Sequence, residues 1–292
     1  MSIRLAVFDM AGTTVADDNH VAKAFQEAFR KNGIEIELEA ANPLMGYHKP
    51  LAIQLLLEQS GIEFDEELID QIHGDFEDAM IDFYEYDLAV KPITGAEDVF
   101  EKLKENGIDH TYLTLHVGAG TFKPVKSEKM ADHEMHAEFI DVSKETIQQL
   151  INNTDKIIAV GTTSLRTLES LYWLGVKSIE NLVSSHLVVN QWEPYETESN
   201  LSAKGALLAL LSWMQKNKTD RLFSKTQIII APGYKPKLAK ALITNFHQPQ
   251  STLLLLVAAL IGDEWRKVYD YALQHNFRFL SYGDGCLLWI SP

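Results

Sequence analysis

One glycine and three hydroxyl residues, Gly161–Ser164, stand between a short apolar run and a helical pattern. At such a turn, backbone N–H groups and hydroxyls can gather around the carboxylate or the sugar hydroxyls of a ligand. Arg166 can pair with a carboxylate or a phosphate, and Gly118 and Gly120 let the backbone approach a ligand closely. The turn taken alone is explained equally well as an ordinary helix N-cap with Arg166 at the surface.

Acid–base chemistry is available from His133, His136 and Glu138, which lie close together in the sequence. Two imidazoles and a carboxylate can exchange protons near neutral pH. Their spacing is not that of a zinc-binding helix and no cysteine accompanies them, so we expect no metal here. The alternative is a polar patch without a catalytic role. Asn245 and His247 either join this chemistry or form the turn and cap before an apolar helix.

Asp9 follows the apolar run Ile3–Phe8 and opens a loop that ends in Gly12-Thr-Thr14. A carboxylate at the end of a strand lies where an open α/β sheet presents its ligands. It can act as a nucleophile or hold a divalent metal. The alternative is an aspartate that opens a turn, but the neighbouring hydroxyls favour a functional role.

The elements that must position these residues alternate between strand and helix patterns, which predicts an α/β fold. The expected strands are Ile3–Phe8, His110–His116, Lys156–Val160, Leu182–Val189, Gln227–Ile230, Phe279–Tyr282 and Leu287–Ile290. The expected helices are His20–Asn32, Pro50–Gln59, Glu66–Tyr84, Gly95–Asn106, a helix from Gly161–Ser164 through Trp173, Lys237–Leu242, Gln250–Leu260 and Glu264–Asn276.

The composition changes sharply along the 292 residues. Residues 1–108 carry 8 Lys and Arg against 23 Asp and Glu, so the whole net charge of −15 lies there, whereas residues 109–292 are neutral. A phosphate backbone would be repelled by the first part and tolerated by the second. The single cysteine, Cys286, excludes an intrachain disulfide and fits a reducing compartment. We see no signal peptide and no apolar run of the roughly 20 residues that a membrane span needs, so we expect a cytoplasmic protein without a membrane partner.

Residues 1–108 resemble the haloacid-dehalogenase (HAD) superfamily, specifically its branch of phosphonoacetaldehyde hydrolases. Two stretches carry the resemblance, VFDMAGTTVADD around Asp9 and Met45-Gly-Tyr-His-Lys49. The resemblance implies that Asp9 is the nucleophile with Ala11 beside it, that Mg²⁺ is bound, and that Lys49 forms a Schiff base; the alternative for Lys49 is a surface lysine. The superfamily's later lysine and acidic pair are missing, although Thr114 lies roughly where its Ser/Thr would fall. We therefore expect this part to be inactive as a hydrolase.

Residues 110–292 resemble the S-adenosylmethionine:tRNA ribosyltransferase-isomerases of queuosine biosynthesis, an α/β family. Six stretches carry this resemblance, in the order of the family: Leu115–Phe122, Asp132–Glu138, Val160–Ser164 with Arg166 and Glu169, Pro232–Tyr234, Thr244–Pro249 with Ser251 and Thr252, and Phe279–Asp284. It implies transfer and isomerisation of the ribosyl group of S-adenosylmethionine onto 7-aminomethyl-7-deazaguanine in tRNA, giving epoxyqueuosine without a metal.

The resemblance also implies roles for particular residues. The acid–base candidates are His133, His136, Glu138 and His247. The groups expected to hold S-adenosylmethionine are Gly118, Gly120, Gly161, Thr162, Thr163, Ser164, Arg166 and Asn245. The partners would be tRNA and this small cosubstrate, and the sequence indicates no oligomeric state.

The two resemblances divide the chain into residues 1–108, a truncated HAD segment with a helical cap, and residues 109–292, a ribosyltransferase-like domain. The N-terminal half of the ribosyltransferase family is missing, which can impair the transferase. A magnesium-dependent hydrolase using Asp9 and a non-catalytic chimera are the alternatives. We expect few contacts between the parts beyond helix Glu97–Asn106, and pairing of Ile3–Phe8 with Tyr112–Leu115 would count against this division.

Overall fold

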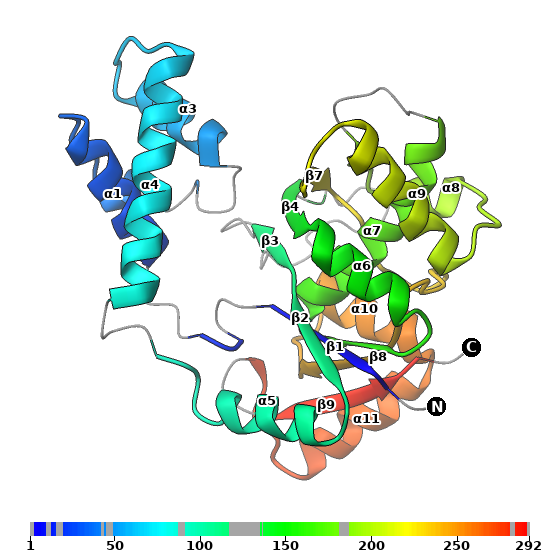
Figure 1. The fold of residues 1–292 in the computed structure, drawn as a ribbon. Coiled ribbons are helices and arrows are strands. Elements are labelled where there is room, and N and C mark those ends of the chain that lie inside the picture. The colour runs from blue at the N-terminus through cyan, green and yellow to red at the C-terminus, as the bar shows by residue number, and fades with distance from the viewer. Residues whose placement is uncertain are drawn as a thin grey trace. The chain divides into compact units, whose positions relative to one another are not determined.

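A computed structural model describes residues 3–9, 13–15, 20–41, 44, 49–86, 91–116, 135, 137–180, 187–280 and 284–290 (Figure 1). The fold is α/β, as the sequence predicts. The chain forms two compact units. Unit 1 takes residues 1–10, 98–115 and 122–292, and unit 2 takes residues 11–97 and 116–121.

Unit 1 is built on a five-stranded sheet in the order β2-β1-β5-β8-β9. Its strands are β1 (Leu5–Phe8), β2 (Asp109–Tyr112), β5 (Ile157–Val160), β8 (Ala239–Asn245) and β9 (Gly285–Trp289). The first four in sheet order run parallel and β9 is antiparallel to β8. All four residues of β1 are buried, as expected for a parallel strand that is covered on both faces.

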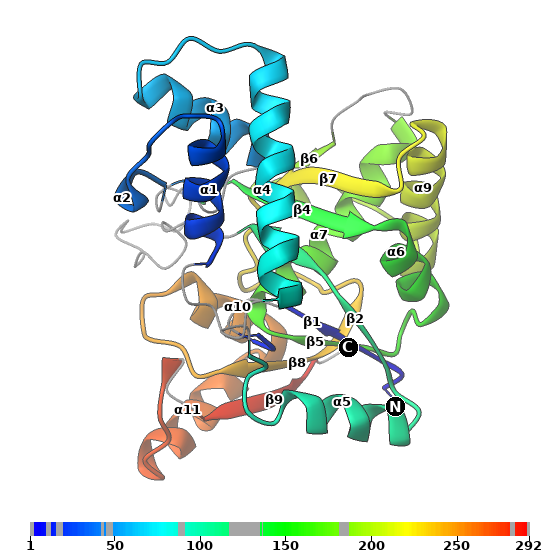
Figure 2. The ribbon, with the colours of Figure 1, turned by 60° about the vertical axis from the view of Figure 1, so that its left-hand side comes forward.

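Helices cover both sides of this sheet. On one side, Phe100 and Leu103 of α5 (Ala96–Glu105) pack against Ala6 and Phe8 of β1 and Ile158 of β5. On the other side, α7 (Thr162–Glu180) packs against β5 and β8, and α6 (Lys144–Asn152) packs against β2. Figures 1 and 2 show α5 and α7 on opposite sides of the sheet.

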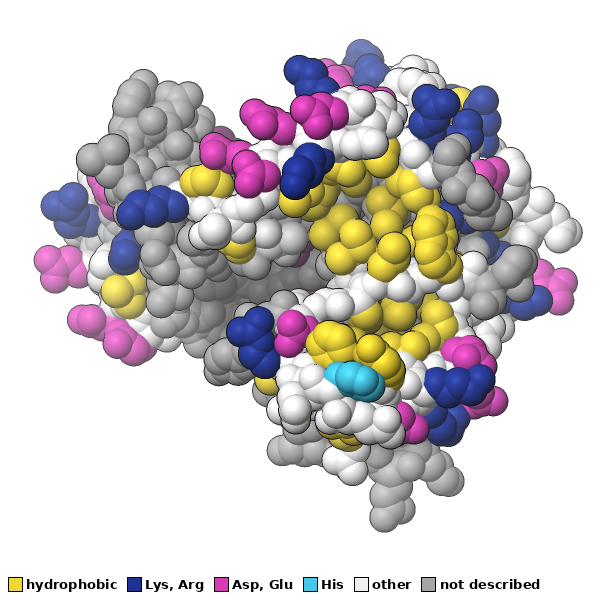
Figure 3. Space-filling model, turned by 90° about the horizontal axis from the view of Figure 1, so that it is seen from below, with side chains coloured by type: hydrophobic (Ala, Val, Ile, Leu, Met, Phe, Trp, Pro, Cys, Tyr) yellow, Lys and Arg dark blue, Asp and Glu magenta, His cyan; other side chains and the backbone are white. Residues whose placement is uncertain are grey.

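The α5 side of the sheet is only partly covered. Ile243 of β8 pairs with Leu287 of β9, and Ala241 pairs with Trp289, so these residues share the face on which Ala241 meets the α5 cluster. Ile243, Leu287 and Trp289 are exposed, and Figure 3 shows hydrophobic side chains gathered on the underside of the molecule. Helix α5 therefore covers β1 but leaves the β8–β9 end of this face open to solvent.

A second sheet has the order β3-β4-β7-β6. Its strands are β3 (Thr114–His116), β4 (Glu138–Ser143), β7 (Arg221–Thr226) and β6 (Val188–Val189). Next to it, α9 (Ala203–Lys216) packs against α7. Gly175 makes this approach possible, since a Cβ there would lie 2.2 Å from the carbonyl oxygen of Ala206. The short α8 (Glu193–Glu196) precedes α9, and α10 (Thr252–Ile261) and α11 (Glu264–Gln274) follow β8.

Unit 2 is a helical bundle of α1 (His20–Lys31), α2 (Leu38–Ala41), α3 (Lys49–Gln59) and α4 (Glu66–Tyr86). Its core packs Phe25 and Phe29 of α1 against apolar residues of α3 and α4, among them Ile53 and Ile72. The helices expected at His20–Asn32, Pro50–Gln59 and Glu66–Tyr84 are confirmed in α1, α3 and α4, while their role as a cap stays a prediction. No helix in the described part of the chain combines the length and the apolar character that crossing a membrane requires.

Three sequence expectations for the elements are wrong. Phe279–Tyr282 was expected as a strand, but Phe279 and Leu280 belong to no strand, and residues 281–282 lie outside the described residues. Lys237–Leu242 was expected as a helix, but Ala239–Asn245 is strand β8 because its backbone pairs with β5 on one edge and with β9 on the other. Gln227–Ile230 was expected as a strand, but β7 ends at Thr226. Strand β4 and helices α6 and α9 were not anticipated.

The expectation of few contacts between the two parts of the sequence is also wrong. Strand β1 pairs with β2, from Leu5 with Asp109 to Phe8 with Tyr112, and on its other side with Ile157–Val160 of β5. A short apolar strand gains most by burying both faces and pairing both edges, because buried backbone N–H and C=O groups need partners. Phe8 pairs with Tyr112, and Leu113 N donates to the carbonyl of Phe8, so this result counts against residue 108 as a structural division. The boundary near residue 108 stays a prediction about sequence resemblance and is not a break in the sheet.

Replacing Leu5 should destabilise unit 1. All five tryptophans lie between residues 173 and 289, so tryptophan fluorescence reports on this unit alone. Leu5 is fully buried, so Leu5→Ala should lower the free energy of unfolding by about 2–5 kcal/mol in a urea titration followed by fluorescence. The control Leu273→Ala, at a side chain that is 64% exposed, should change it by less than about 0.5 kcal/mol. An unchanged transition for Leu5→Ala would show that β1 is not part of this sheet.

Candidate functional site

Several predicted residues lie at the carboxyl edge of the five-stranded sheet. Phe8 pairs with Val160, and Val160 pairs with Ile243, so Asp9, Gly161 and Asn245 all follow the same end of neighbouring parallel strands. Hydrogen bonds continue this alignment past the strands, from Leu113 N to the carbonyl of Phe8 at 3.1 Å and from Gly161 N to the carbonyl of Ile243 at 2.8 Å. Segments that are far apart in the sequence thus meet at one edge.

The turn at Gly161 leads directly into helix α7. Gly161 has a φ of +94°, in the region that favours glycine, and no atom of the described residues lies within 4 Å of where a Cβ would stand. Thr162 and Thr163 are half-buried in the first turn of the helix. Ser164 is buried, and its Oγ has no hydrogen-bond partner among the described residues. The turn therefore has open space and an unused hydroxyl.

Arg166 is buried, so the alternative that placed it at the surface beside an ordinary helix N-cap is wrong. Its Nη1 donates to Oε2 of Glu138, and both side chains are at most 5% exposed. Its Nε and Nη2 have no partner among the described residues. The same two nitrogen atoms of Arg221 show what such an edge can bind. Its Nε and Nη2 donate to the two carboxylate oxygens of Asp141, at 3.0 and 2.7 Å. The free edge of Arg166 therefore has the geometry that binds a carboxylate in two places.

His247 lies just beyond β8 in a fixed orientation. Its Nε2 is 3.0 Å from Oγ1 of Thr244, and its backbone N–H donates to the hydroxyl of Tyr269 at 3.0 Å. Burial lowers the pKa of His247 to about 4, so its imidazole is neutral at neutral pH. Asn245, two residues earlier, is exposed at the end of β8. The structure thus brings Asn245 near the Gly161 turn, while the catalytic role of His247 stays a prediction.

Five predicted site residues lie outside the described residues. These are Ala11, Gly118, Gly120, His133 and His136. We expect Gly118, Gly120, His133 and His136 to lie around the same pocket as the Gly161 turn, and Ala11 to lie beside Asp9. These placements stay predictions, and so does the expectation that no metal is bound.

A network that the sequence did not reveal connects two of the matched stretches. The carboxylate of Glu169, in α7, accepts from the hydroxyl of Tyr234 at 2.7 Å and from the backbone N–H groups of Lys237, Leu238 and Ala239 at 2.7, 3.0 and 3.2 Å. Burial raises the pKa of Glu169, and these hydrogen bonds oppose that effect. The sequence offered one hint of this contact, because Glu169 and Tyr234 both belong to stretches that carry the family resemblance. Their bond fixes the chain at the start of β8.

Lys49 is a predicted site residue of unit 2 that lies within the described part of the chain. Its Nζ lies 5.4 Å from the ring centroid of Phe25 and 5.7 Å from that of Phe76. Desolvation by burial lowers the pKa of Lys49 to about 8. A fraction of this amine is therefore neutral near pH 7, which an ordinary surface lysine would not show.

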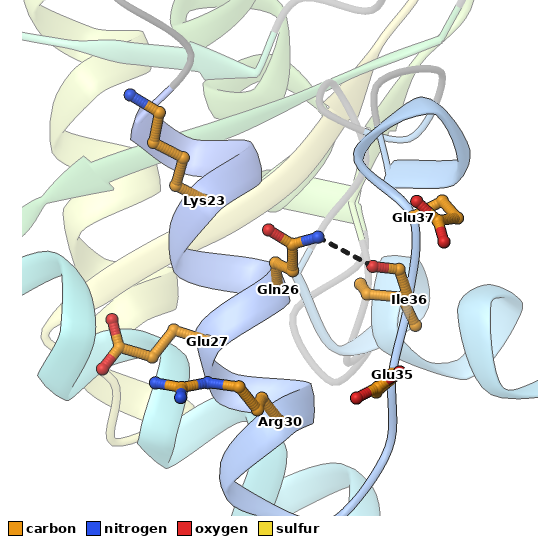
Figure 4. A pocket seen from close by; sticks show the side chains of 7 residues that line it. All are labelled: Lys23, Gln26, Glu27, Arg30, Glu35, Ile36 and Glu37. Atoms are coloured by element: carbon orange, nitrogen blue, oxygen red, sulfur yellow. Dashed lines mark hydrogen bonds between the residues drawn. The ribbon is translucent and has the colours of Figure 1, made fainter.

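Unit 2 also has a polar groove of about 360 Å³ between α1 and the segment that follows it (Figure 4). The side chain of Gln26 donates to the carbonyl of Ile36 at 3.0 Å across this groove. Its remaining lining side chains are charged, namely Lys23, Glu27, Arg30, Glu35 and Glu37. The groove contains none of the predicted site residues.

The sequence of residues 93–288, two thirds of the chain, matches the family model described as queuosine biosynthesis protein. The chain therefore belongs to this family. It is similar to the S-adenosylmethionine tRNA ribosyltransferase of Thermotoga maritima, with 30% identity over 65% of this chain and 48% of that chain and a TM-score of 0.40. The chain thus spans about half the length of that relative.

A phosphonoacetaldehyde hydrolase-like protein from Oleispira antarctica is 20% identical over 57% of this chain and 68% of that chain, with a TM-score of 0.38. Both TM-scores are low, so the family assignment rests on the sequence match.

Replacing Glu169 by glutamine should destabilise unit 1. In Glu169→Gln an amide NH₂ replaces one carboxylate oxygen and cannot accept from the donors that face it. Each donor left without an acceptor should cost about 1–3 kcal/mol of unfolding free energy, measured by urea unfolding with tryptophan fluorescence. Glu264→Gln, at an exposed surface pair with Lys267, is the matched control and should be nearly neutral. Equal stability of the two variants would contradict a structural role for Glu169.

Proposed function

We propose that unit 1 transfers and isomerises the ribosyl group of S-adenosylmethionine onto 7-aminomethyl-7-deazaguanine in tRNA. One observation carries this proposal. Arg166, on the helix that follows the Gly161 turn, is held by Glu138 of β4, and its Nε and Nη2 have no partner among the described residues. An amino-acid carboxylate fits that edge in charge and in shape. Membership of the queuosine biosynthesis family agrees with this cosubstrate.

The roles follow from the chemistry of the cosubstrate. Its sulfonium makes the adjacent ribose carbon acidic, so a base must remove a proton there, and adenine must be protonated as it leaves. His247 is neutral at working pH and can accept a proton, but a pKa of about 4 makes it a weak base. His133 and His136 are the other candidates for the base. Glu138 is committed to Arg166, which favours a positioning role for this carboxylate. No metal is required for these steps.

The remaining binding groups come from the turns. Gly161, Thr162, Thr163 and Ser164 offer N–H groups and hydroxyls at the start of α7, and Asn245 adds an amide at the neighbouring strand. Gly118 and Gly120 complete the set expected from the sequence. The neutral charge balance of residues 109–292 is compatible with a tRNA partner, and such a partner fits the cytoplasmic location that we expect.

The experiment that tests this proposal is incubation with S-adenosylmethionine and tRNA carrying the 7-aminomethyl-7-deazaguanine precursor. Adenine and methionine should be released together with formation of epoxyqueuosine, all followed by mass spectrometry. Adenine release without tRNA, or no release in the presence of both substrates, would contradict the proposed reaction.

Arg166→Ala should weaken the binding of S-adenosylmethionine by about 1.5–3 kcal/mol if the free edge holds its carboxylate, as measured by calorimetric titration. Arg221→Ala, which removes an exposed arginine of the same geometry, is the control and should leave affinity unchanged. Because Arg166→Ala leaves Glu138 buried without its partner, the double variant Glu138→Gln/Arg166→Gln provides a second test with both charges removed. Unchanged affinity in both variants would contradict the assignment of Arg166 to the carboxylate of S-adenosylmethionine.

A second candidate function, a phosphonatase-like hydrolase, is favoured only by Lys49. An amine with a pKa of about 8 can attack a carbonyl compound and form a Schiff base. Trapping with a small aldehyde and cyanoborohydride should modify Lys49 increasingly as the pH rises through about 8, since the neutral amine is the nucleophile. Exposed Lys31 provides the internal reference in peptide mapping.

Modification of Lys49 no greater than that of Lys31 would count against this candidate. Magnesium-dependent hydrolysis of a phosphonate that is lost in Asp9→Asn would instead rank it above the transferase.

A further inference from the structure

The order of the strands reverses between β1 and β5. From β1, the chain returns through α5 to β2 on one side, whereas β5 lies on the other side and leads through α7 toward β8. Helices α5 and α7 lie on opposite sides of the sheet (Figures 1 and 2). In open α/β sheets, ligands bind outside the carboxyl ends of the strands at such a reversal.

Two groups of different character stand at this reversal. Phe8 and Val160 are register partners, so Asp9 and Gly161 are the first residues beyond them, on strands about 4.8 Å apart. Asp9 is half-buried and supplies a carboxylate, which only accepts hydrogen bonds when it is ionised. Gly161 leaves open space and begins α7, whose first N–H groups are donors.

A buried hydroxyl provides a second, independent sign of a ligand. Ser164 is only 1% exposed, yet its Oγ, in the first turn of α7, has no partner among the described residues. A buried polar group without a partner is costly unless something else binds it. The first turn of α7, which follows Gly161 at this edge of the sheet, therefore contains a buried hydroxyl that a ligand can bind.

A vicinal diol matches this arrangement. Its hydroxyls can donate to the carboxylate and accept from the N–H groups and from Ser164, whereas a phosphate ester alone would be repelled by Asp9. A carboxylate offers about four lone-pair positions, so Asp9 can bind groups of its own chain and a ligand together. We propose that Asp9 binds the ribose hydroxyls of a nucleoside at the reversal between β1 and β5, opposite the first turn of α7.

Asp9 lies outside the residues 93–288 that match the queuosine biosynthesis family. The N-terminal segment would thus supply a binding group to a site whose other residues belong to the family-matched part of the chain. The assignment of the nucleoside as the adenosyl group rests on the proposed function, whereas recognition of a ribose diol by Asp9 does not.

The test measures binding by calorimetry with three probes: S-adenosylhomocysteine, which does not react, adenosine, and 2′,3′-dideoxyadenosine, which lacks the diol. Asp9→Ala should weaken binding of the first two about tenfold or more, and binding of the dideoxy probe less than twofold. Asp9→Asn, which keeps the shape and one acceptor oxygen, should give an intermediate affinity if Asp9→Ala does not fold. Asp109→Asn is the control, because Asp109 lies at the opposite end of β2 in the same sheet.

The outcomes separate the two proposals. Wild-type binding of S-adenosylhomocysteine that neither Asp9 variant changes overturns the role of Asp9 and leaves the transferase standing. Asp9-dependent binding of adenosine without any preference for S-adenosylhomocysteine supports the diol site and counts against the cosubstrate. Absence of binding to all three probes overturns both.

Discussion

Strand β1 holds unit 1 together because it pairs on both sides, with β2 and with β5. These strands come from positions about 100 and 150 residues further along the chain, so every one of their backbone bonds closes a long loop. Burial of all four side chains of Leu5–Phe8 offsets that cost, and Ala6 and Phe8 join the cluster beneath α5. If β1 were removed, strands β2 and β5 would have no common neighbour, and the reversal of strand order would not exist.

The chemistry of unit 1 depends on this arrangement in two ways. The parallel strands bring Asp9, Gly161 and Asn245 to a single edge, although local sequence does not connect them. Helix α7 then carries two buried ionisable side chains with different roles. Arg166 donates to Glu138, while its Nε and Nη2 have no partner among the described residues. Glu169 accepts hydrogen bonds from the backbone at the start of β8 and so joins that segment to the helix. One helix thereby links the turn that begins it to the strand that ends in Asn245.

The sequence predicted those features that are local. Short apolar runs identified Leu5–Phe8 and Ile157–Val160 as strands, and the glycine and hydroxyl residues identified the turn at Gly161. It could not predict that the two strands lie side by side, since pairing over 150 residues leaves no local trace. Lys237–Leu242 shows the opposite failure, because its apolar spacing suits a helix while backbone pairing with β5 and β9 makes it part of a strand.

The candidate site was predicted in its residue types more than in its contacts. Arg166 was identified as an anion-binding group, but its burial and its bond to Glu138 depend on the meeting of α7 with β4. The family stretches also contained Glu169 and Tyr234, whose hydrogen bond is structural. Motifs shared within a family thus combine residues that bind ligands with residues that hold the frame.

Native-state hydrogen exchange, read by mass spectrometry on peptides covering β1 and β5, tests most directly whether β1 belongs to this sheet. Because the amides of Leu5–Phe8 and Ile157–Val160 share one set of backbone bonds, both peptides should show the same protection and lose it at the same denaturant concentration. Rapid exchange of Leu5–Phe8 while Ile157–Val160 stays protected would contradict the account.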